Sequence, residues 1–353
     1  MSVSPIRKCD EVDATDSFPE VTVVIPTLAS GSTLRRCLES VSQSSYPCRK
    51  TELIIVDGGS RDDSVQIAGS FGAKVLFRPG TSRGGACNEG VREAAGEFVA
   101  MTDSDAVVTS EWLSRIVSEM LADDSLVAIG GPDLGSAGES TVGKSGTAID
   151  LFRRRKQEEG WKAVFKIKGV NSAYRRQAFL EVGGFDEFLL FGEESELHAR
   201  IVALGRKIKY LPALVVYHRR HLQTWRSLGR SFRTSRRTAP LLLRPWTLRA
   251  ALHDPTSSLA TLLFLVLAMS LALPTFALAL VRGNLDVLVG LAVSYMSACV
   301  VYSTIVVRKT ESAVGLSLFL VTVTILAVQS ILRGLGATLG LFEALYKWKM
   351  SEH

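Results

Sequence analysis

Cysteine is scarce in this sequence and forms no metal-binding pattern. The 353 residues include five cysteines, and none forms a CxxC pair or lies at a zinc-ligand spacing from a histidine. Zinc ribbons and zinc fingers need such spacings, so these classes are excluded. Unpaired, reduced thiols in a cytosolic setting are the expectation for all five cysteines.

The first twenty residues lack the apolar core of a signal peptide. We therefore expect residues 1–20 to be a flexible leader, and the domain after it to stay on the side where it is made. Acidic residues are absent between His218 and Leu252, a stretch with nine arginines. No groove-reading or base-stacking module accompanies these arginines, which argues against nucleic acid as the partner. A basic stretch beside apolar runs is instead typical of contact with anionic membrane lipids.

Long apolar runs are missing from the first 250 residues and frequent in the last hundred. The runs at 257–281, 285–307 and 313–332 are each long enough to cross the hydrocarbon layer, which needs about 20 residues. The arginines that precede them place the N-terminal domain on the cytoplasmic side of a multi-pass cell-membrane protein. The predicted organisation is a leader, an α/β domain, arginine-rich interfacial helices, about three transmembrane helices and an interfacial C-terminal segment, at residues 1–20, 21–220, 221–256, 257–335 and 336–353.

Short apolar runs alternate with helical patterns from residue 21 to about residue 217. Apolar residues recur at helical spacing in 33–41 and 65–71. The runs between them are apolar throughout, as in strands buried on both faces of a parallel sheet, and occupy residues 21–26, 52–57, 73–77 and 97–101. The expected fold class is therefore α/β, with a mostly parallel sheet between layers of helices.

Polar residues gather where three of these strands end, at Pro26-Thr27, at Asp57 and at Asp103-Ser104-Asp105. Ligands of open α/β sheets bind at this edge. Two carboxylates one residue apart repel each other unless a cation, hydrogen-bond donors or water compensates them. A solvated turn is the alternative for the Asp103–Asp105 pair.

Five segments resemble, in order, the successive motifs of family 2 glycosyltransferases with the GT-A fold: VTVVIPT, ELIIVDGGSRDDS, GGACNEGVREAAGEFVAMTDSDA, NSAYRRQAFLEVGGFDEFLLFGEESELHARI and VVYH. The resemblance covers about residues 20–220 and lies in the order of the motifs more than in any one of them. It implies a Rossmann-like, mostly parallel mixed sheet, followed here by a helical membrane region. It also implies transfer of a sugar from a nucleotide-diphosphate-sugar with inversion.

The resemblance implies roles for the residues at the strand ends. Asp57 would accept hydrogen bonds from the nucleobase, beside a wall formed by Pro26 and Thr27. Asp105 would bind Mg²⁺ or Mn²⁺ directly, whereas Asp103 would hold the ribose or a metal-bound water, since hard oxygen ligands suit these ions. A turn-forming role is the alternative for Asp57.

His218, at the end of the VVYH segment, is a candidate third metal ligand, because a neutral imidazole binds Mn²⁺. A structural histidine is the alternative. Glu194 stands where the family carries the catalytic aspartate, and we expect it to be the general base, with Glu193 and Glu196 as supporting acids. The alternative is that the three glutamates only meet the positive end of a helix dipole.

Three departures from the family pattern bear on substrate and activity. Asp57 is followed by Gly58 instead of a second acid, and Leu28 stands where an acid or amide is usual. These two departures leave open which nucleobase the donor carries. Gln223 and Arg226 have the spacing of the QxxRW motif of processive synthases, but the final tryptophan is missing, which favours single addition.

Three functions remain open at this point. The first is transfer of the sugar to a hydroxyl of a lipid-linked saccharide, because a hydroxyl needs a base such as Glu194. The second is transfer to a polyprenyl phosphate, which is already anionic and needs none. The third is an inactive nucleotide-sugar-binding assembly subunit, suggested by the departures from the family pattern.

Overall fold

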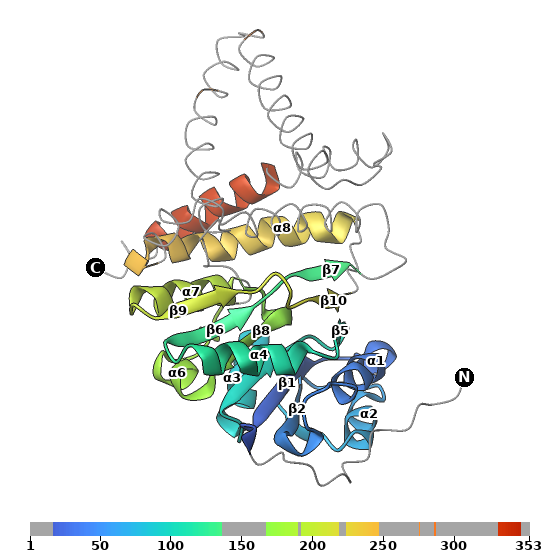
Figure 1. Ribbon diagram of the computed structural model, residues 1–353. Helices are drawn as coiled ribbons and strands as arrows, with labels where there is room; N and C mark the ends of the chain where they lie inside the picture. Colours follow the sequence, from blue (N-terminus) through green and yellow to red (C-terminus); the bar gives the residue numbers. More distant parts are fainter. Residues whose placement is uncertain are drawn as a thin grey trace. The chain divides into compact units, whose positions relative to one another are not determined.

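The computed structural model describes residues 17–135, 167–189, 192–218, 224–246 and 331–346, together with Thr275 and Asp286 (Figure 1). The chain divides into two compact units. The first consists of Met1–Ser136 and Val164–Arg219, and the second of Ala137–Ala163 and Arg220–His353.

Four parallel strands form one half of the main sheet of the first unit: β1 (Val21–Thr27), β2 (Thr51–Asp57), β3 (Lys74–Phe77) and β4 (Phe98–Met101). Each begins and ends within one residue of its predicted range. β1 is inaccessible to solvent from Val21 to Ile25, as expected of a strand covered on both faces.

Three further strands complete the sheet: β6 (Leu126–Gly130), β8 (Ser172–Arg175) and β9 (Lys207–Tyr210). The strand order is β3-β2-β1-β4-β8-β6-β9. β8 runs antiparallel to both of its neighbours, while β6 and β9 are parallel to each other. The prediction of a mostly parallel mixed sheet is confirmed.

A second, three-stranded sheet places the last strand of the first unit beside the turn that follows β4. It consists of β5 (Ala106–Val108), β10 (Val216–His218) and β7 (Asp133–Gly135), in the order β5-β10-β7. The register pairs His218 with Ala106 on one side and with Gly135 on the other. His218 is thereby fixed next to the turn that carries Asp103 and Asp105.

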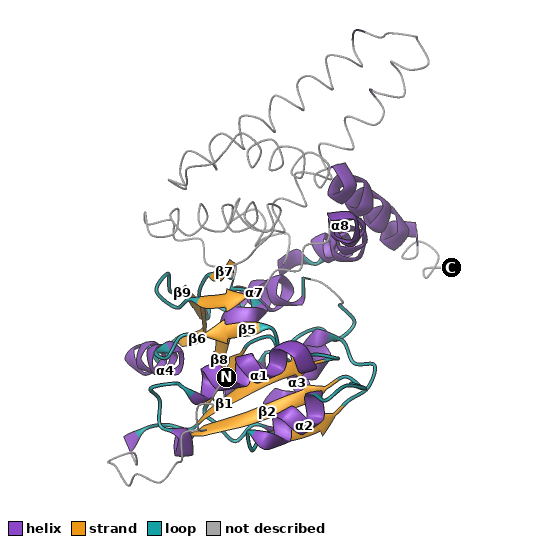
Figure 2. Ribbon diagram, turned by 90° about the vertical axis from the view of Figure 1, so that its right-hand side faces the viewer, coloured by secondary structure: helices purple, strands orange, loops and turns teal. Residues whose placement is uncertain are grey.

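Helices cover both faces of the main sheet (Figure 2). One hydrophobic core contains Leu38, Ile67 and Trp112, from α1 (Gly31–Ser42), α2 (Ser64–Ser70) and α4 (Trp112–Ala122). The other contains Val91, Phe179 and Leu197, from α3 (Arg83–Glu93), α6 (Arg176–Glu181) and α7 (Glu193–Ala203). This unit also contains the short 3₁₀ helices η2 (Cys48–Lys50) and η3 (Gly169–Asn171).

The second unit contains α8 (Thr224–Thr238), η4 (Ala239–Leu243) and a helix over residues 331–346. Gly336 and Gly340 let the helix at 331–346 approach α8 closely. A Cβ at these positions would lie 2.3 Å from the Phe232 carbonyl oxygen and 1.8 Å from that of Arg236. Arg236 Nε also lies 3.0 Å from Glu343 Oε2, so a buried glycine contact and an ion pair join the two helices.

None of the helices within the described ranges has both the length and the apolar character needed to cross a bilayer. The spans predicted at 257–281, 285–307 and 313–332 lie outside the described residues, apart from Thr275, Asp286 and residues 331–332. The leader predicted at 1–20 is described only from residue 17 onward.

Cys37 and Cys87 are free and buried, as predicted. Cys48 is disulfide-bonded, so the prediction of five reduced thiols is wrong for this residue. A disulfide needs only a second sulfur at the right distance and angle, and sequence spacing does not report that geometry.

Candidate active site

The Asp103 and Asp105 carboxylates lie on the tight turn between β4 and β5. The Ala106 amide donates to the Asp103 carbonyl at 3.0 Å and closes this turn. The Ser104 hydroxyl lies 2.8 Å from that of Ser30, which ties the turn to the loop after β1. About a quarter of the Asp103 side chain and a third of the Asp105 side chain remain accessible, so both can meet a ligand.

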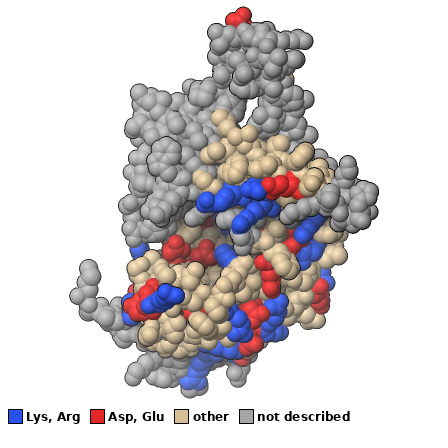
Figure 3. All heavy atoms as spheres, turned by 180° about the vertical axis from the view of Figure 1, so that it is seen from behind, with Lys and Arg blue, Asp and Glu red and all other residues tan. Residues whose placement is uncertain are grey.

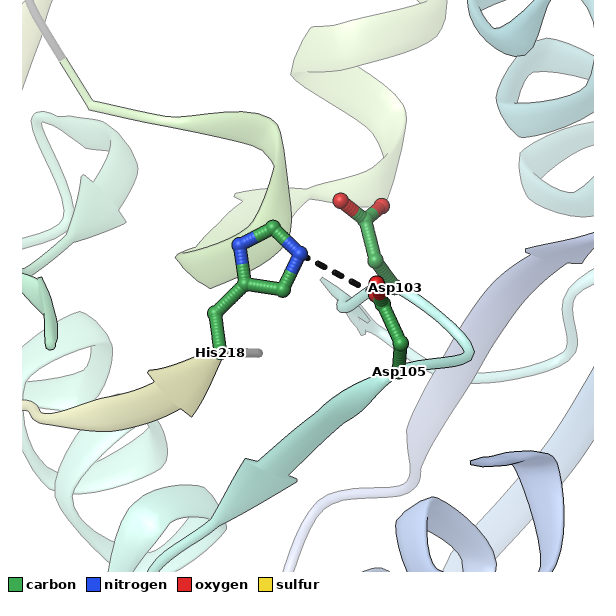
Figure 4. Close-up of side chains that lie close together, drawn as sticks. All are labelled: Asp103, Asp105 and His218. Carbon is green, nitrogen blue, oxygen red and sulfur yellow. Dashed lines mark ion pairs between the residues drawn. The ribbon is translucent and has the colours of Figure 1, made fainter. Parts of the chain in front are cut away.

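His218 faces Asp105, with Nε2 3.0 Å from Oδ1 (Figure 4). One ligand atom each from Asp103, Asp105 and His218 lie within 4.8 Å of one another. A hard divalent ion such as Mg²⁺ holds oxygen ligands at about 2.1 Å, so opposite ligands stand about 4 Å apart. Two carboxylate oxygens and one imidazole nitrogen at this spread fit a single Mg²⁺ or Mn²⁺ after small side-chain movements.

A second carboxylate lies behind the imidazole of His218. This carboxylate belongs to Asp133, a buried residue that also pairs with Lys168. Nδ1 of His218 lies 3.7 Å from Oδ2 of Asp133. Burial lowers the pKa of His218, but hydrogen bonds to Asp105 and Asp133 and the charges of Asp105 and Asp103 outweigh it and raise the pKa to about 9. Without a metal ion, the positive charge of the His218 imidazolium therefore balances the negative charge of Asp105. A metal ion that binds His218 would have to displace the proton of the ring nitrogen it binds.

Arg83 compensates Asp103, a role that the sequence analysis missed. Its Nε and Nη2 donate to the same oxygen, Asp103 Oδ1, at 3.0 and 2.7 Å. Its third nitrogen, Nη1, lies 3.5 Å from Glu194 Oε1 and 3.9 Å from Glu193 Oε1. Gly84, the next residue, lets α3 pack closely here, because a Cβ on Gly84 would lie 3.1 Å from the Phe185 Cβ and 3.6 Å from the Glu193 Cγ.

Glu193 and Glu194 lie at the start of α7, across Arg83 from Asp103. Gly192 precedes them with φ 81°, a left-handed conformation that glycine adopts without strain. The Gly169 amide donates to Glu194 Oε1 at 3.2 Å. Burial, and next the charge of Glu194, raise the pKa of Glu193 to about 7. The acids do stand at a helix N-terminus, as the alternative interpretation has it, but they also face the half-buried Arg83.

Glu196 has a different environment from the other two glutamates. It is buried, and Arg200, one turn further along α7, donates from Nε to its Oε1 at 3.2 Å. The same guanidinium donates to the Gly184 carbonyl at 2.9 Å. Glu196 thus ties α7 to the segment after α6.

Asp57 ends β2 with its carboxylate almost inaccessible to solvent. It accepts hydrogen bonds from the Gly59 amide at 3.3 Å and from the Ser60 amide at 3.1 Å, so it forms the turn that the alternative interpretation foresaw. The β1–β2 register pairs it with Thr27, and Pro26 with Val56. Pro26, Thr27 and Asp57 therefore share one corner of the strand ends.

Residues 22–183 match the family model described as glycosyl transferase family 2. This segment contains Pro26, Thr27, Asp57, Asp103 and Asp105 in the geometry given above. The segment is a family 2 glycosyltransferase domain. The match ends before Glu193, Glu194 and His218, so the placement of these three residues rests on the structure alone.

Proteins similar to this chain are found in archaea and bacteria. Glycosyltransferase AglE of Haloferax volcanii is 27% identical over 214 residues, which cover 58% of this chain and 68% of AglE. Pre-mycofactocin glycosyltransferase of Mycobacterium tuberculosis is 30% identical over 240 residues, which cover 65% of this chain and 48% of that protein. The chain thus spans about two thirds of the length of AglE and about half of the length of the mycobacterial protein.

Two solved structures share the fold. The mannosyltransferase PcManGT from Pyrobaculum calidifontis, in complex with GDP-Man and Mn²⁺, superposes with a TM-score of 0.58 at 20% identity, over 90% of both chains. S. aureus TarS 1-349 gives a TM-score of 0.50 at 17% identity, over 92% of this chain and 91% of that one. The GT-A fold expected from the motifs is confirmed.

Proposed function

We propose that this protein transfers a sugar from a nucleotide-diphosphate-sugar to a hydroxyl of a lipid-linked saccharide, with inversion at the anomeric carbon. The observation that carries the proposal is the cluster of Asp103, Asp105 and His218 at the strand ends, with Glu194 across Arg83 from it. Support also comes from PcManGT, which shares the fold and was solved with GDP-Man and Mn²⁺.

The donor would lie along the strand ends, from Asp57 to the turn at 103–105. Pro26 and Thr27 would form the wall beside the nucleobase of the donor. Asp57 would accept hydrogen bonds from the nucleobase through the lone pairs that its own turn does not use. Asp105 and His218 would hold Mg²⁺ or Mn²⁺, with Asp103 on the ribose or a metal-bound water. When bound, the ion would supply positive charge for the departing diphosphate.

Glu194 would take the proton from the acceptor hydroxyl as the new bond to the sugar forms. A general base must lie within hydrogen-bond reach of that proton and remain ionised at the working pH. The Gly169 amide and the Arg83 guanidinium both lie beside the carboxylate of Glu194 and would orient it. Glu193, whose pKa is raised to about 7, would support the acceptor as a hydrogen-bond donor or acceptor according to pH.

The second unit would hold the enzyme at a membrane surface. The helix at 331–346 exposes Ile331, Leu335, Leu339 and Phe342, which recur every three or four residues and so share one face. Beside it lies a hollow of about 510 Å³ lined by Arg233, Arg236, Arg237 and Glu343, among others. Basic and acidic side chains lie side by side on the surface shown in Figure 3.

An apolar helix face next to exposed arginines is typical of helices that lie in an anionic bilayer interface. We therefore propose a cell-membrane enzyme whose catalytic domain faces the cytoplasm, with further membrane helices at residues 257–335. The arginines could also hold the phosphates of a lipid-linked acceptor, because guanidinium binds phosphate with two parallel hydrogen bonds.

Two variants separate this function from its alternatives when transfer from radiolabelled nucleotide sugars is measured in membranes. Loss of transfer in both Asp105→Ala and Glu194→Gln supports the proposed function. Transfer that survives Glu194→Gln supports a polyprenyl phosphate as the acceptor, since a phosphate needs no base. If the unmodified protein transfers no sugar from any nucleotide but still binds one, it is an assembly subunit.

A further inference from the structure

Arg83 is the one side chain seen to bridge the two halves of the site within the part of the chain that the structure describes. Two of its nitrogens meet Asp103 on the donor side, and the third points at Glu194 and Glu193 on the acceptor side. Its guanidinium is planar and rigid, so a movement at one end is passed to the other. Burial lowers the pKa of Arg83, but the charges of Asp103 and Glu194 and the hydrogen bonds to Asp103 outweigh it, and the residue stays protonated.

The contact to Glu194 is incomplete. Nη1 of Arg83 is buried, and no hydrogen-bond partner lies in reach with suitable geometry. A buried donor without a partner lowers the stability of the folded protein. The guanidinium is therefore not at its best position in the ligand-free protein, and a small displacement towards α7 would complete the bond to Glu194.

Gly169 leaves the space for this contact. A Cβ on Gly169 would lie 2.3 Å from Arg83 Nη1, 2.6 Å from Arg83 Nη2 and 2.6 Å from Glu194 Oε1. No side chain can stand there without moving Arg83 and Glu194. The absence of a side chain at Gly169 thus permits Arg83 and Glu194 to lie next to each other.

We propose that Arg83 is a positioning residue that couples the donor side of the site to the base. This inference rests on the proposed function of Glu194. In the ligand-free protein Arg83 lies against Asp103. When the donor occupies the strand ends, its ribose or a metal-bound water competes for Asp103, and Arg83 turns its free donor to Glu194. Glu194 is then fixed in place only when a donor is present, which limits abortive reaction with water.

The test uses full-length enzyme and the nucleoside diphosphate, among UDP, GDP and dTDP, that protects it most against heat with Mn²⁺. For Arg83→Lys we expect nucleotide affinity by calorimetry within about threefold of the parent. We expect kcat for transfer to fall about a hundredfold, the loss typical of a misplaced catalytic group. Arg92→Lys, at the other end of α3 and paired with Glu89 and Glu187, is the matched control and should change neither value.

A double-mutant cycle identifies the partner of Arg83. If Arg83 acts through Glu194, Arg83→Lys in a Glu194→Gln background lowers kcat no further, because the two losses are not additive. Losses that multiply, or a nucleotide affinity that falls more than about tenfold with kcat unchanged, overturn the proposal. The second outcome would make Arg83 a donor ligand instead.

Gly169→Ala perturbs the same contact from the other side and should reproduce the loss in kcat. Gly69→Ala, where an added Cβ meets nothing within 4 Å, is its control. If the parent transfers no sugar, the proposed function fails, and thermal stability still tests the coupling. The combined change of Arg83→Met and Glu194→Gln should then destabilise the protein less than the sum of the single changes, and strict additivity overturns the inference.

Discussion

Glu193→Gln should make the ligand-free protein more stable, and only at neutral and alkaline pH. The Glu193 carboxyl is buried beside Glu194, and its pKa in the folded protein is raised from 4.5 to about 7. Below about pH 4.5 the group is protonated in both the folded and the unfolded state, so it does not change stability. As the pH rises towards 7, the unfolded state gives up the proton first, and the folded state loses stability.

The size of the effect follows from this rise in pKa. A rise from 4.5 to about 7 corresponds to roughly 3 kcal/mol of lost stability above pH 7. Glutamine keeps the shape of the protonated acid and removes the ionisation, so most of this loss should be recovered. For a unit of this size the gain raises the melting temperature by on the order of 5–10 °C.

The assay is thermal unfolding of purified protein from pH 4.5 to pH 8.5, without nucleotide or metal. Glu111→Gln is the matched control, because Glu111 lies on the surface with Arg115 as its partner and should give a flat difference. The reasoning is refuted if Glu193→Gln gives no gain in stability at pH 8, or an equally large gain at pH 4.5. Either result would mean that burial and the charge of Glu194 do not destabilise the ionised form of Glu193.

Three further predictions concern the frame of the site and the second unit. Asn171→Ala should lower the free energy of unfolding by about 2–4 kcal/mol in a denaturant titration. The buried Asn171 amide accepts a hydrogen bond from Trp112 and donates to the Pro132 and Leu214 carbonyls, and all three groups would lose a partner. Gly340→Val should separate α8 from the helix at 331–346 and increase proteolysis there, whereas Gly69→Val should not. Phe342→Glu, on a side chain that is 69% exposed, should weaken binding to anionic vesicles without changing nucleotide affinity, and unchanged vesicle binding would remove the helix at 331–346 from the membrane interface.

The strands β1, β2, β3 and β4 could be predicted closely because each is a short and largely apolar run. The runs at 21–26 and 52–57 consist almost wholly of apolar residues, and β1 and β2 follow them within a residue. The strands β5, β7 and β10 form only three residue pairs with each neighbour, and their pairing depends on contacts between distant parts of the chain. Local pattern carries little information about such a sheet.

The acids of the site could be predicted because they follow strands and stand in motif order. The partners of those acids could not. Arg83 opens a helix in a stretch rich in glycine, and nothing local marks it as the partner of Asp103, which lies twenty residues further along. Asp133, which lies behind His218, follows β6, a strand that we did not foresee. Charge compensation in a site is a property of the folded chain, since the partners come from different elements.

Glu196 shows the opposite limit of motif reasoning. Three glutamates in four residues suggested one acid cluster, but Glu196 pairs with Arg200 of its own helix, whereas Glu193 and Glu194 face Arg83. The partner of each acid depends on the elements that pack around α7, which the spacing of the three glutamates does not report.

The central claim is that Asp103 and Asp105 come to share a divalent ion with the diphosphate of a sugar nucleotide. Isothermal titration calorimetry of the intact enzyme with UDP-, GDP- and dTDP-sugars, with and without Mn²⁺, tests it most directly. The account predicts binding of at least one nucleotide sugar that Mn²⁺ strengthens at least about tenfold, and loss of that gain in Asp105→Ala. Binding of equal strength with and without the ion, or an Asp105→Ala variant that keeps the full gain, would contradict it.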